Sequence, residues 1–286
     1  MRSLAMKKMI FILTLVFCFV NTAEACTLFA SNGDRTTDGG SIIVKNRDEK
    51  PTEQTLMLDS KGKYKFYGLY AMTDGKWSLK CGVNEKGLAV VTAAASAIPK
   101  NIRNKDSTKG ALKKLLANCS TVEQALSYGE YFSRAQFIMI ADKNEIAYVE
   151  VGLKNYEIKR VKNDVLAHTN HYLLPTTSGS NIKISTSSKY RLNRIETLLK
   201  SKNKFTLEDF IKFSGDKKGG AANAIWRGGL SEKGSQSLAV FAVQIKKNGD
   251  TEIYVKLRRT PKEKGNEDVV RVSGEEIFNK TFKLPT

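Results

Sequence analysis

A cysteine lies at the end of a segment that has the features of an export signal. Cys26 follows directly on an Ala-Glu-Ala tripeptide that ends at Ala25, a small-x-small pattern typical of signal-peptide cleavage. Lys7 and Lys8 precede an apolar run at 9–20, which is shorter than the roughly 20 residues that span a bilayer as a helix. We therefore expect signal peptidase to remove the first 25 residues as a signal peptide, leaving Cys26 as the new first residue.

A cysteine at the start of a chain can act as nucleophile and general base at once. An α-amine has an ordinary pKa of about 7.7–8.0, so it can accept the proton of its own thiol near neutral pH. No histidine is needed, and we predict that His168 and His171 have packing and hydrogen-bonding roles instead. Their spacing, with few acidic neighbours, also does not indicate a metal site, and no cofactor is expected.

Two further groups would help such a nucleophile. A carboxylate and a cation near the amine would hold it, and the segment "KNRDE" supplies Asp48 and Arg47 just after a predicted strand. A hydrogen-bond donor aimed at the developing oxyanion typically contributes a few kcal/mol to transition-state stabilisation. Asn170, in "AHTNHY", offers an amide donor that does not titrate.

Strands are predicted near both ends of the mature chain, and they must position these residues. Turn residues such as Asn-Gly and Asp-Gly-Gly separate the short apolar runs near the start, and "NEKG" predicts a hairpin turn. The predicted strands are 26–31, 41–46, 54–59, 64–69, 76–83, 87–94, 136–141, 145–151, 156–161, 237–246 and 252–258.

Helical periodicity occupies the stretches between these strands. Leucines around 112–116, the stretch 121–131, the stretch 187–199 and a short segment at 206–213 predict helices. On the helix at 187–199 we place the apolar face on Leu192 and Ile195, with Arg191 elsewhere. This order predicts an α+β fold in which two antiparallel sheets carry helices on their outer faces. No repeat or linker divides the chain, so we expect one catalytic domain over residues 26–286.

Four motifs in order resemble one group of enzymes. The opening "CTLFASNGDRTTDGGSIIVKNRDE" is similar to that of the N-terminal-nucleophile (Ntn) hydrolases of the Cys type, and "GVNEKGLAVV" resembles their hairpin. The segments "HTNHYL" and "SSKYRLNRIETLL" are most similar to the acyl-CoA:6-aminopenicillanate acyltransferase family, which is related to the choloylglycine hydrolases and penicillin V acylases. The resemblance implies a four-layer αββα sandwich.

The same resemblance implies roles for individual residues. Cys26 would be nucleophile and base, Asp48 would orient the amine, and Asn170 would be the oxyanion donor. Arg227 lies roughly where the family keeps a late active-site arginine, although its local motif matches poorly, so a surface ion pair is the alternative. Two positions depart from related bile-salt hydrolases: Lys45 replaces an arginine, for which Arg47 could compensate, and Ala94 replaces an asparagine.

The predicted function is that of an exported amidohydrolase or acyltransferase that acts on linear, non-peptide amides through a Cys26 thioester. One alternative is an N-terminal-Cys dipeptidase, because those enzymes also begin with Cys-Thr and carry a segment like "DGGSIIVKNRD". The other is a lipid-anchored envelope binding protein whose first mature residue is a lipid-modified cysteine. Against it, Ala23 stands where such signals usually carry leucine.

Charge and cysteine content bear on the surroundings of the protein. The chain has a formal net charge of +18, and loss of three basic residues and Glu24 with the signal leaves +16. Such a surface favours an anionic substrate or peripheral contact with an anionic envelope surface, whereas no motif organises the lysines for nucleic acid. The location expected is periplasmic or secreted. Of the three remaining cysteines, Cys81 and Cys119 form either a disulfide or two buried thiols.

Overall fold

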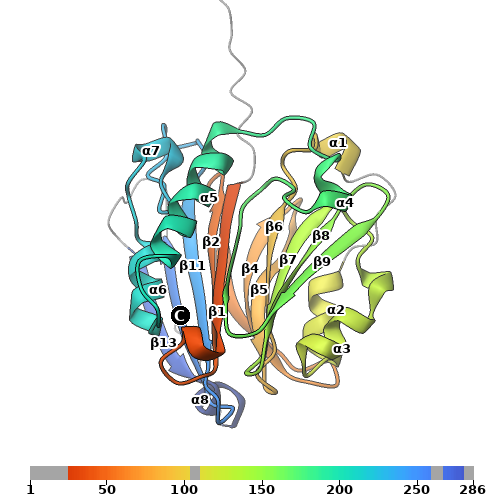
Figure 1. Cartoon of the computed structure of the whole chain (residues 1–286), viewed down its shortest axis with the longest axis vertical. Helices are drawn as coiled ribbons and strands as arrows, with labels where there is room; N and C mark the ends of the chain where they lie inside the picture. The colour runs from red at the N-terminus through yellow and green to blue at the C-terminus, as the bar shows by residue number, and fades with distance from the viewer. Residues whose placement is uncertain (1–24, 104–109, 259–266, 280–286) are drawn as a thin grey trace, which may run out of the picture.

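Two antiparallel sheets packed face to face make up the centre of the molecule, and helices cover both outer faces (Figure 1). The computed structural model describes residues 25–103, 110–258 and 267–279. Residues 1–24, on which most of the predicted signal peptide falls, lie outside the described residues. The predicted α+β class and the four-layer αββα arrangement are confirmed.

The first sheet has six strands in the order β10-β1-β2-β11-β12-β13. Their bounds are β1 Ala25–Asn32, β2 Ser41–Glu49, β10 Val165–His168, β11 Gln236–Ile245, β12 Thr251–Arg258 and β13 Glu267–Ser273. Every residue of β1 and β11 is buried because both faces of this sheet are covered. Their nearly continuous apolar runs follow from that position.

The second sheet has seven strands in sequential order, β3 to β9. They are β3 Gln54–Asp59, β4 Phe66–Thr73, β5 Lys76–Asn84, β6 Ala89–Ala94, β7 Gln136–Ala141, β8 Ile146–Val151 and β9 Tyr156–Val161. The predicted "NEKG" hairpin joins β5 to β6. Gly87 has φ +77° there, in the left-handed region that glycine adopts without a steric penalty.

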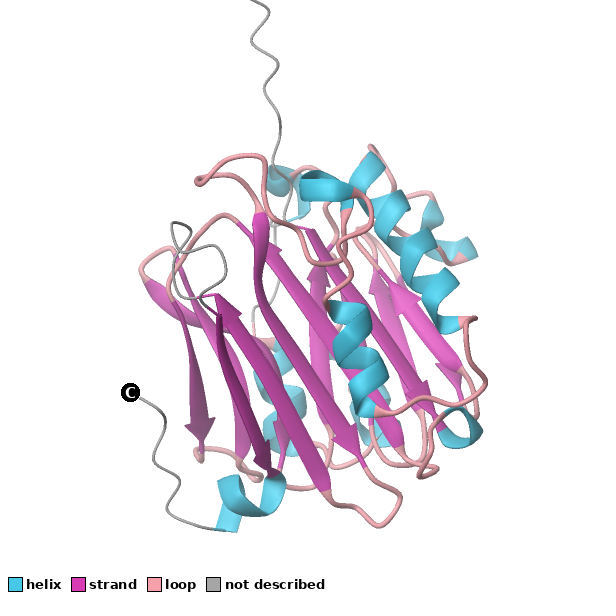
Figure 2. Cartoon of the chain, turned by 90° about the vertical axis from the view of Figure 1, so that its left-hand side faces the viewer, coloured by secondary structure: helices cyan, strands magenta, loops and turns pink. Residues whose placement is uncertain are grey.

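Helices pack on the outer face of each sheet. Helices α5 Thr186–Leu199 and α6 Leu207–Ser214 lie on the six-stranded sheet, and Figure 2 views the molecule from this side. Helices α2 Ala111–Asn118 and α3 Val122–Ser127 lie on the seven-stranded sheet. The shorter helices are α1 Lys100–Arg103, α4 Pro175–Ser178, α7 Gly220–Asn223 and α8 Gly274–Asn279.

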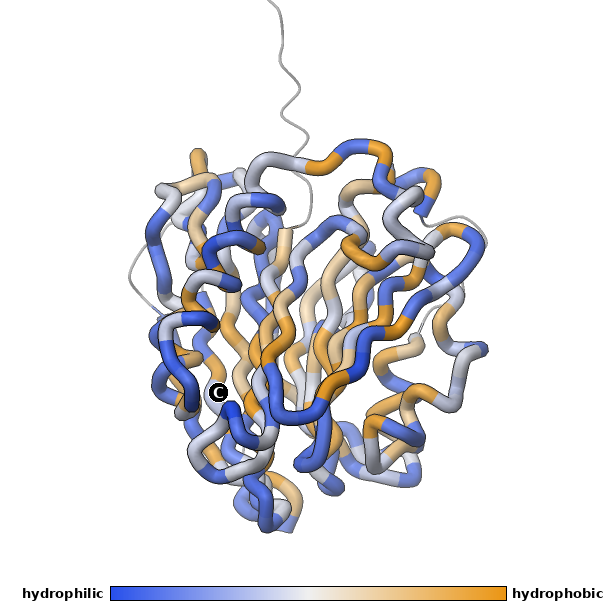
Figure 3. The backbone as a smooth tube through the Cα atoms, in the orientation of Figure 1, coloured by the Kyte–Doolittle hydropathy of each residue, from blue (hydrophilic) through white to orange (hydrophobic). Residues whose placement is uncertain are grey.

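Three apolar clusters hold these four layers together. One fills the space between the sheets and includes the side chain of Cys26, a second lies under α2 and α3, and a third lies under α5 and α6. Figure 3 shows that hydrophobic residues concentrate in the strands and hydrophilic ones in the connecting turns. The side chain of Cys26 therefore faces the inter-sheet layer, close to the point where strand β1 begins.

Most sequence-predicted elements are present with shifted ends. The predicted helix at 121–131 stops at Ser127 and is followed by a short 3₁₀ turn, Gly129–Tyr131. Strand β4 extends to Thr73, beyond the predicted end at 69. Strands β10 and β13 and the C-terminal helix α8 were not predicted from the sequence.

Candidate active site

Cys26 is the second residue of β1 and lies opposite Arg47 of β2. Directly opposed residues in an antiparallel pair project to the same face, so both side chains enter the inter-sheet layer. The side chain of Cys26 is buried, and its backbone nitrogen donates to Asn170 Oδ1 at 2.9 Å. In the full chain this nitrogen is the amide that follows Ala25, and it becomes an α-amine only when that peptide bond is cut.

Asn170 reaches Cys26 because strand β10 pairs with β1. His168, the last residue of β10, lies opposite Leu28, and the chain then continues toward Cys26. Asn170 Oδ1 accepts from Cys26 N and from Arg191 Nη2, each at 2.9 Å, while Nδ2 donates to Ala94 O at 2.9 Å. Two donors on one atom and an acceptor on the other fix which way the amide points. Ala94, one of the predicted departures from the relatives, contributes a carbonyl oxygen to this arrangement.

Arg191 is a site residue that the sequence prediction missed. Its guanidinium donates to the carbonyl oxygen of Cys26, to Thr27 Oγ1 at 2.8 Å and to Asn170 Oδ1. The side chain is completely buried. Burial lowers its pKa to about 10, an effect that the charge of Asp48 opposes.

The placement of Arg191 away from the packed face of its helix was therefore wrong. Apolar spacing assigns a face to leucine and isoleucine but gives no place to a buried cation that binds backbone oxygen. The available signal was its position within "SSKYRLNRIETLL", one of the segments that resemble the acyltransferase family. Helix α5 carries Ser188 three residues earlier, and both side chains contact Asn170.

Asp48 lies on the other face of the sheet from the thiol. It pairs with Ala25, the residue before Cys26, and it is 1% exposed. Its Oδ1 accepts from Ser237 Oγ at 2.6 Å, and its Oδ2 has no hydrogen-bond donor among the described residues. Burial raises the pKa of Asp48, against the charges of Arg191 and Arg227 and the hydrogen bond from Ser237, which lower it.

Arg227 belongs to this cluster through Asp48. Its Nη1 lies 3.8 Å from Asp48 Oδ2, and the same atom donates to Ser235 Oγ at 3.1 Å. Two hydrogen bonds hold the loop that carries it: Arg227 N donates to Ser237 Oγ at 2.8 Å, and Ser237 N donates to Arg227 O at 3.1 Å. The arginine side chain is 11% exposed. The alternative of a surface ion pair is therefore wrong for Arg227.

Two cations lie on the thiol side of β2. Arg47 is buried and donates to Gln54 Oε1 at 3.2 Å. Lys45 is buried as well, and its ammonium group donates to the carbonyl oxygens of Lys80 and Thr92 on the opposite sheet. Arg47 lies directly across from Cys26, whereas Lys45 lies two residues further along and ties the two sheets together.

The two other described cysteines are free thiols. Cys81 lies in the inter-sheet cluster with Cys26, whereas Cys119 lies in the cluster under α2 and α3, on the other side of the seven-stranded sheet. The disulfide alternative is therefore wrong, because a layer of sheet separates the two side chains. Burial raises the pKa of Cys81 to about 12 and that of Cys119 to about 11.

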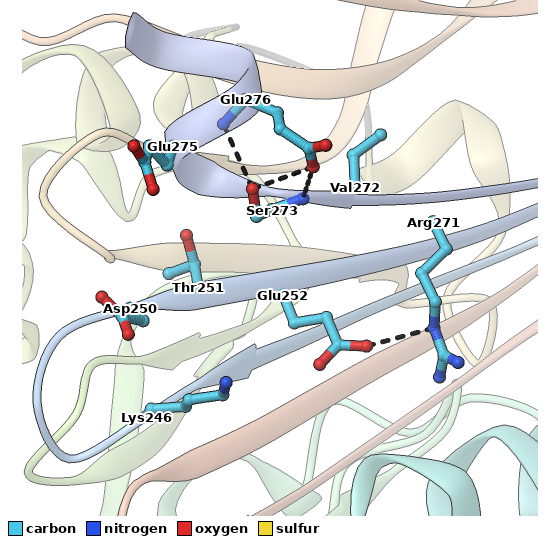
Figure 4. A pocket seen from close by; sticks show the side chains of 9 residues that line it. All are labelled: Lys246, Asp250, Thr251, Glu252, Arg271, Val272, Ser273, Glu275 and Glu276. Atoms are coloured by element: carbon cyan, nitrogen blue, oxygen red, sulfur yellow. Dashed lines mark hydrogen bonds and ion pairs between the residues drawn. The ribbon is translucent and has the colours of Figure 1, made fainter.

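Surface cavities lie at the far end of the sandwich from Cys26. One of about 340 Å³ is lined by Lys246, Glu252, Arg271, Ser273 and Glu276, beside α8 (Figure 4). Another, of about 680 Å³, lies where β1 ends at Asn32. Within the first cavity Glu252 and Arg271 form an ion pair at 3.1 Å, and the carboxylate of Glu276 accepts hydrogen bonds from Ser273.

Within the described ranges, no group of histidine, cysteine, aspartate and glutamate side chains is placed to hold a metal ion. None of the helices described is long and apolar enough to cross a membrane.

Comparison with known protein families finds a match over most of the chain. Residues 35–256, well over half of the chain, match the family described as acyl-coenzyme A:6-aminopenicillanic acid acyl-transferase. The matched range begins after Cys26 and contains Asp48, Asn170, Arg191 and Arg227. No curated protein matches the sequence.

Solved structures show the same fold at low sequence identity. The chain is similar to two variants of conjugated bile acid hydrolase from Clostridium perfringens, a cysteine-to-alanine variant with a TM-score of 0.54 and an arginine-to-leucine variant with 0.56. Each is 15% identical, and the match covers 86% of this chain and 92% of the other. A third similar structure is the Caenorhabditis elegans N-acylethanolamine-hydrolyzing acid amidase ortholog, with a TM-score of 0.48, 12% identity and coverage of 76% and 92%. The chain belongs to the acyl-coenzyme A:6-aminopenicillanic acid acyl-transferase family, and it shares its fold with the conjugated bile acid hydrolase structures.

Proposed function

We propose that the protein is an exported amidase of linear, non-peptide amides that works through a thioester on Cys26. The observation that carries this proposal is the set of contacts around Cys26 at the start of strand β1. The nitrogen of Cys26 and the guanidinium of Arg191 meet on Asn170 Oδ1, and Arg191 also holds the carbonyl oxygen of Cys26. Both sides of the residue's backbone are thereby fixed while its side chain points between the sheets.

The proton of the thiol goes to the α-amine that cleavage after Ala25 releases. The thiolate then attacks the carbonyl carbon of the substrate, and a negative charge develops on the carbonyl oxygen. Asn170 Nδ2 carries two protons and gives one to Ala94 O, so the second is available for that oxygen. Collapse of the tetrahedral species breaks the C–N bond, and the α-ammonium returns its proton to the departing amine.

The thioester is then open to two acceptors. Attack by water releases the acyl group as a carboxylic acid and gives hydrolysis. Attack by a second amine gives acyl transfer, and in both cases the Cys26 thiol is regenerated with the α-amine as proton carrier.

Asp48 would bind the charged form of that amine. Its Oδ2 is buried, has no hydrogen-bond donor among the described residues, and belongs to the residue that pairs with Ala25. An α-ammonium left behind by the loss of Ala25 would supply the donor. Arg227, 3.8 Å from the same oxygen, favours the ionised carboxylate.

The cations of the site and the net charge favour a substrate with an anionic end. Arg47 and Lys45 are buried on the thiol side, where an apolar acyl chain would enter the inter-sheet layer. N-acyl amino acids, acyl lactones, penicillin V-like amides and conjugated bile acids are the classes to test. We place the enzyme in the periplasm or outside the cell, with peripheral contact to an anionic envelope surface.

The test compares wild type with Cys26→Ser and Cys119→Ser on this panel, after N-terminal sequencing of the exported protein. We expect a sequence that begins with Cys26, turnover of at least one amide, a loss of at least about 10³-fold in Cys26→Ser, and wild-type rates in Cys119→Ser. Full activity in Cys26→Ser, or in a chain with residues still attached ahead of Cys26, would refute the mechanism. Release of dipeptides without amidase activity would indicate the dipeptidase instead.

A further inference from the structure

A buried ion pair lies directly behind Asn170. His168 Nε2 is 2.8 Å from Glu150 Oε1, and both side chains are completely inaccessible to solvent. His168 is the last residue of β10 in the six-stranded sheet, and Glu150 is on β8 in the seven-stranded sheet. The pair thus connects the two sheets two residues before the asparagine.

Both ring nitrogens of His168 have an oxygen atom as partner. Nδ1 of His168 faces the carbonyl oxygen of Thr169 at 3.1 Å, and Nε2 faces the carboxylate of Glu150. The rings of Phe137 and Tyr148, with centroids 4.2 and 4.9 Å from that of the imidazole, surround the His168 side chain with apolar surface.

Glu150 binds more than the histidine. Its carboxylate also accepts from the backbone nitrogens of Leu173 at 2.7 Å and Leu174 at 3.2 Å, and from the hydroxyl of Thr177. Burial alone would raise the pKa of Glu150, but the bonds and charge from His168, with those from Thr177 and Leu173, lower it overall. The carboxylate of Glu150 therefore binds the chain both before Asn170, at His168, and after it, at Leu173 and Leu174.

The remaining freedom of Asn170 is removed from the other sides. Its backbone nitrogen donates to Ser188 Oγ at 3.0 Å, and its backbone oxygen accepts from Ala97 N at 3.1 Å. A buried ion pair adds little net stability compared with a well-packed apolar pair, so its presence in this core calls for another role.

We propose that Glu150 and His168 are positioning residues that hold the 168–174 segment so that Asn170 meets the oxyanion. The inference rests on the proposed function, because it assigns Asn170 the oxyanion. It predicts that Glu150 acts on the reaction only through Asn170. Neutralising Glu150 should therefore lower kcat and leave KM unchanged, because the oxyanion exists only in the transition state and the intermediate.

The experiment is a double-mutant cycle with Glu150→Gln and Asn170→Ala. We expect kcat to fall about tenfold in Glu150→Gln and about 10²–10³-fold in Asn170→Ala, with no further loss in the double variant. Glu145→Gln is the matched control, because Glu145 immediately precedes β8 at the other end of the strand and pairs with Arg160. Its kcat should match wild type.

Multiplicative losses in the double variant, a change confined to KM, or an unchanged kcat in Glu150→Gln would overturn the inference. If Glu150→Gln does not fold, Thr177→Val replaces it, since it removes one donor to the same carboxylate and conserves shape. The expected loss of kcat is then about threefold, again absent in the Asn170→Ala background.

Hydrogen exchange separates this inference from the proposed function. If wild type turns over no amide, the proposed function fails, and the amides of residues 170–174 become the readout. Exchange there that is faster in Glu150→Gln than in wild type and in Glu145→Gln supports the positioning role. Equal exchange in all three proteins refutes it.

Discussion

His171 makes the free energy of unfolding depend on pH in a window that runs from pH 6.5 down to about pH 4. The side chain is 7% exposed, and its Nδ1 lies 2.8 Å from Ser188 Oγ. Burial lowers the pKa of His171 to about 4 from an ordinary 6.5, and the charge of His168 acts in the same direction. The folded protein therefore keeps this imidazole neutral where the unfolded chain does not.

The magnitude follows from the two pKa values. Between pH 6.5 and about 4 the unfolded chain binds a proton that the folded chain excludes, so stability falls as the pH falls. One pKa unit corresponds to about 1.36 kcal/mol, and pH 5.0 lies about 1.5 units below the unfolded value. Acidification from pH 7.5 to 5.0 should therefore cost at most about 2 kcal/mol through His171.

Urea unfolding of wild type and His171→Asn at the two pH values measures this cost, with the buried Trp226 as the fluorescence reporter. The asparagine oxygen can replace Nδ1 as an acceptor and does not titrate. The stability change between pH 7.5 and 5.0 should be about 2 kcal/mol smaller in the variant, and contributions from other groups cancel in that difference. A difference below about 0.5 kcal/mol would show that His171 is protonated in the folded state or solvated, and would refute the reasoning.

Two further predictions concern the groups around Cys26. Arg191→Lys keeps the charge but cannot contact Cys26 O, Thr27 Oγ1 and Asn170 Oδ1 together, so kcat/KM should fall about 10²-fold in an amidase assay. The control is Arg194→Lys, on the same helix as Arg191, which alters a partly exposed ion pair between Arg194 and Asp216. This variant should retain activity and lose less than about 1 kcal/mol of stability. Equal losses of kcat/KM in both variants would contradict a specific role for Arg191. Ser237→Ala removes a hydrogen bond that lowers the pKa of Asp48, so the acid limb of the kcat/KM profile should move to higher pH. Ser235→Ala, whose hydroxyl contacts Arg227, is the control, and coincident profiles in all three proteins would exclude Asp48 as the group that titrates.

The sequence predicted the two-sheet architecture because strand periodicity and turn residues are local signals. It failed for β10, which is four residues long and gains its stability from pairing with β1. That strand brings Asn170 to Cys26, so the contact between them could be predicted only through resemblance to a family. Asp48 was chosen as a carboxylate just after a predicted strand, and its role toward the amine came from the same resemblance.

Arg191 shows a different limit. Helical periodicity separates apolar from polar positions, and an arginine is assigned to solvent by default. Only the three-dimensional arrangement shows that backbone oxygen of β1 and the amide of Asn170 lie within reach of its guanidinium. Glu150 was missed for the same reason, since its strand contributes all six residues to the interior and its charge is satisfied by partners far along the chain.

Strand β1 begins one residue before Cys26, and for the proposed function this sets a constraint on the order of maturation and folding. Ala25 and Cys26 are each 6% exposed, and Ala25 is already paired with Asp48. An external peptidase binds its substrate as an accessible, extended segment, so the folded sandwich would shield the bond between Ala25 and Cys26. The cleavage that we propose would then have to precede folding, an order that translocation of an unfolded chain would supply. A molecule that folded before this cleavage would be an inactive zymogen in the proposed mechanism. The nitrogen of Cys26, the proposed general base, would still be the amide of its peptide bond with Ala25.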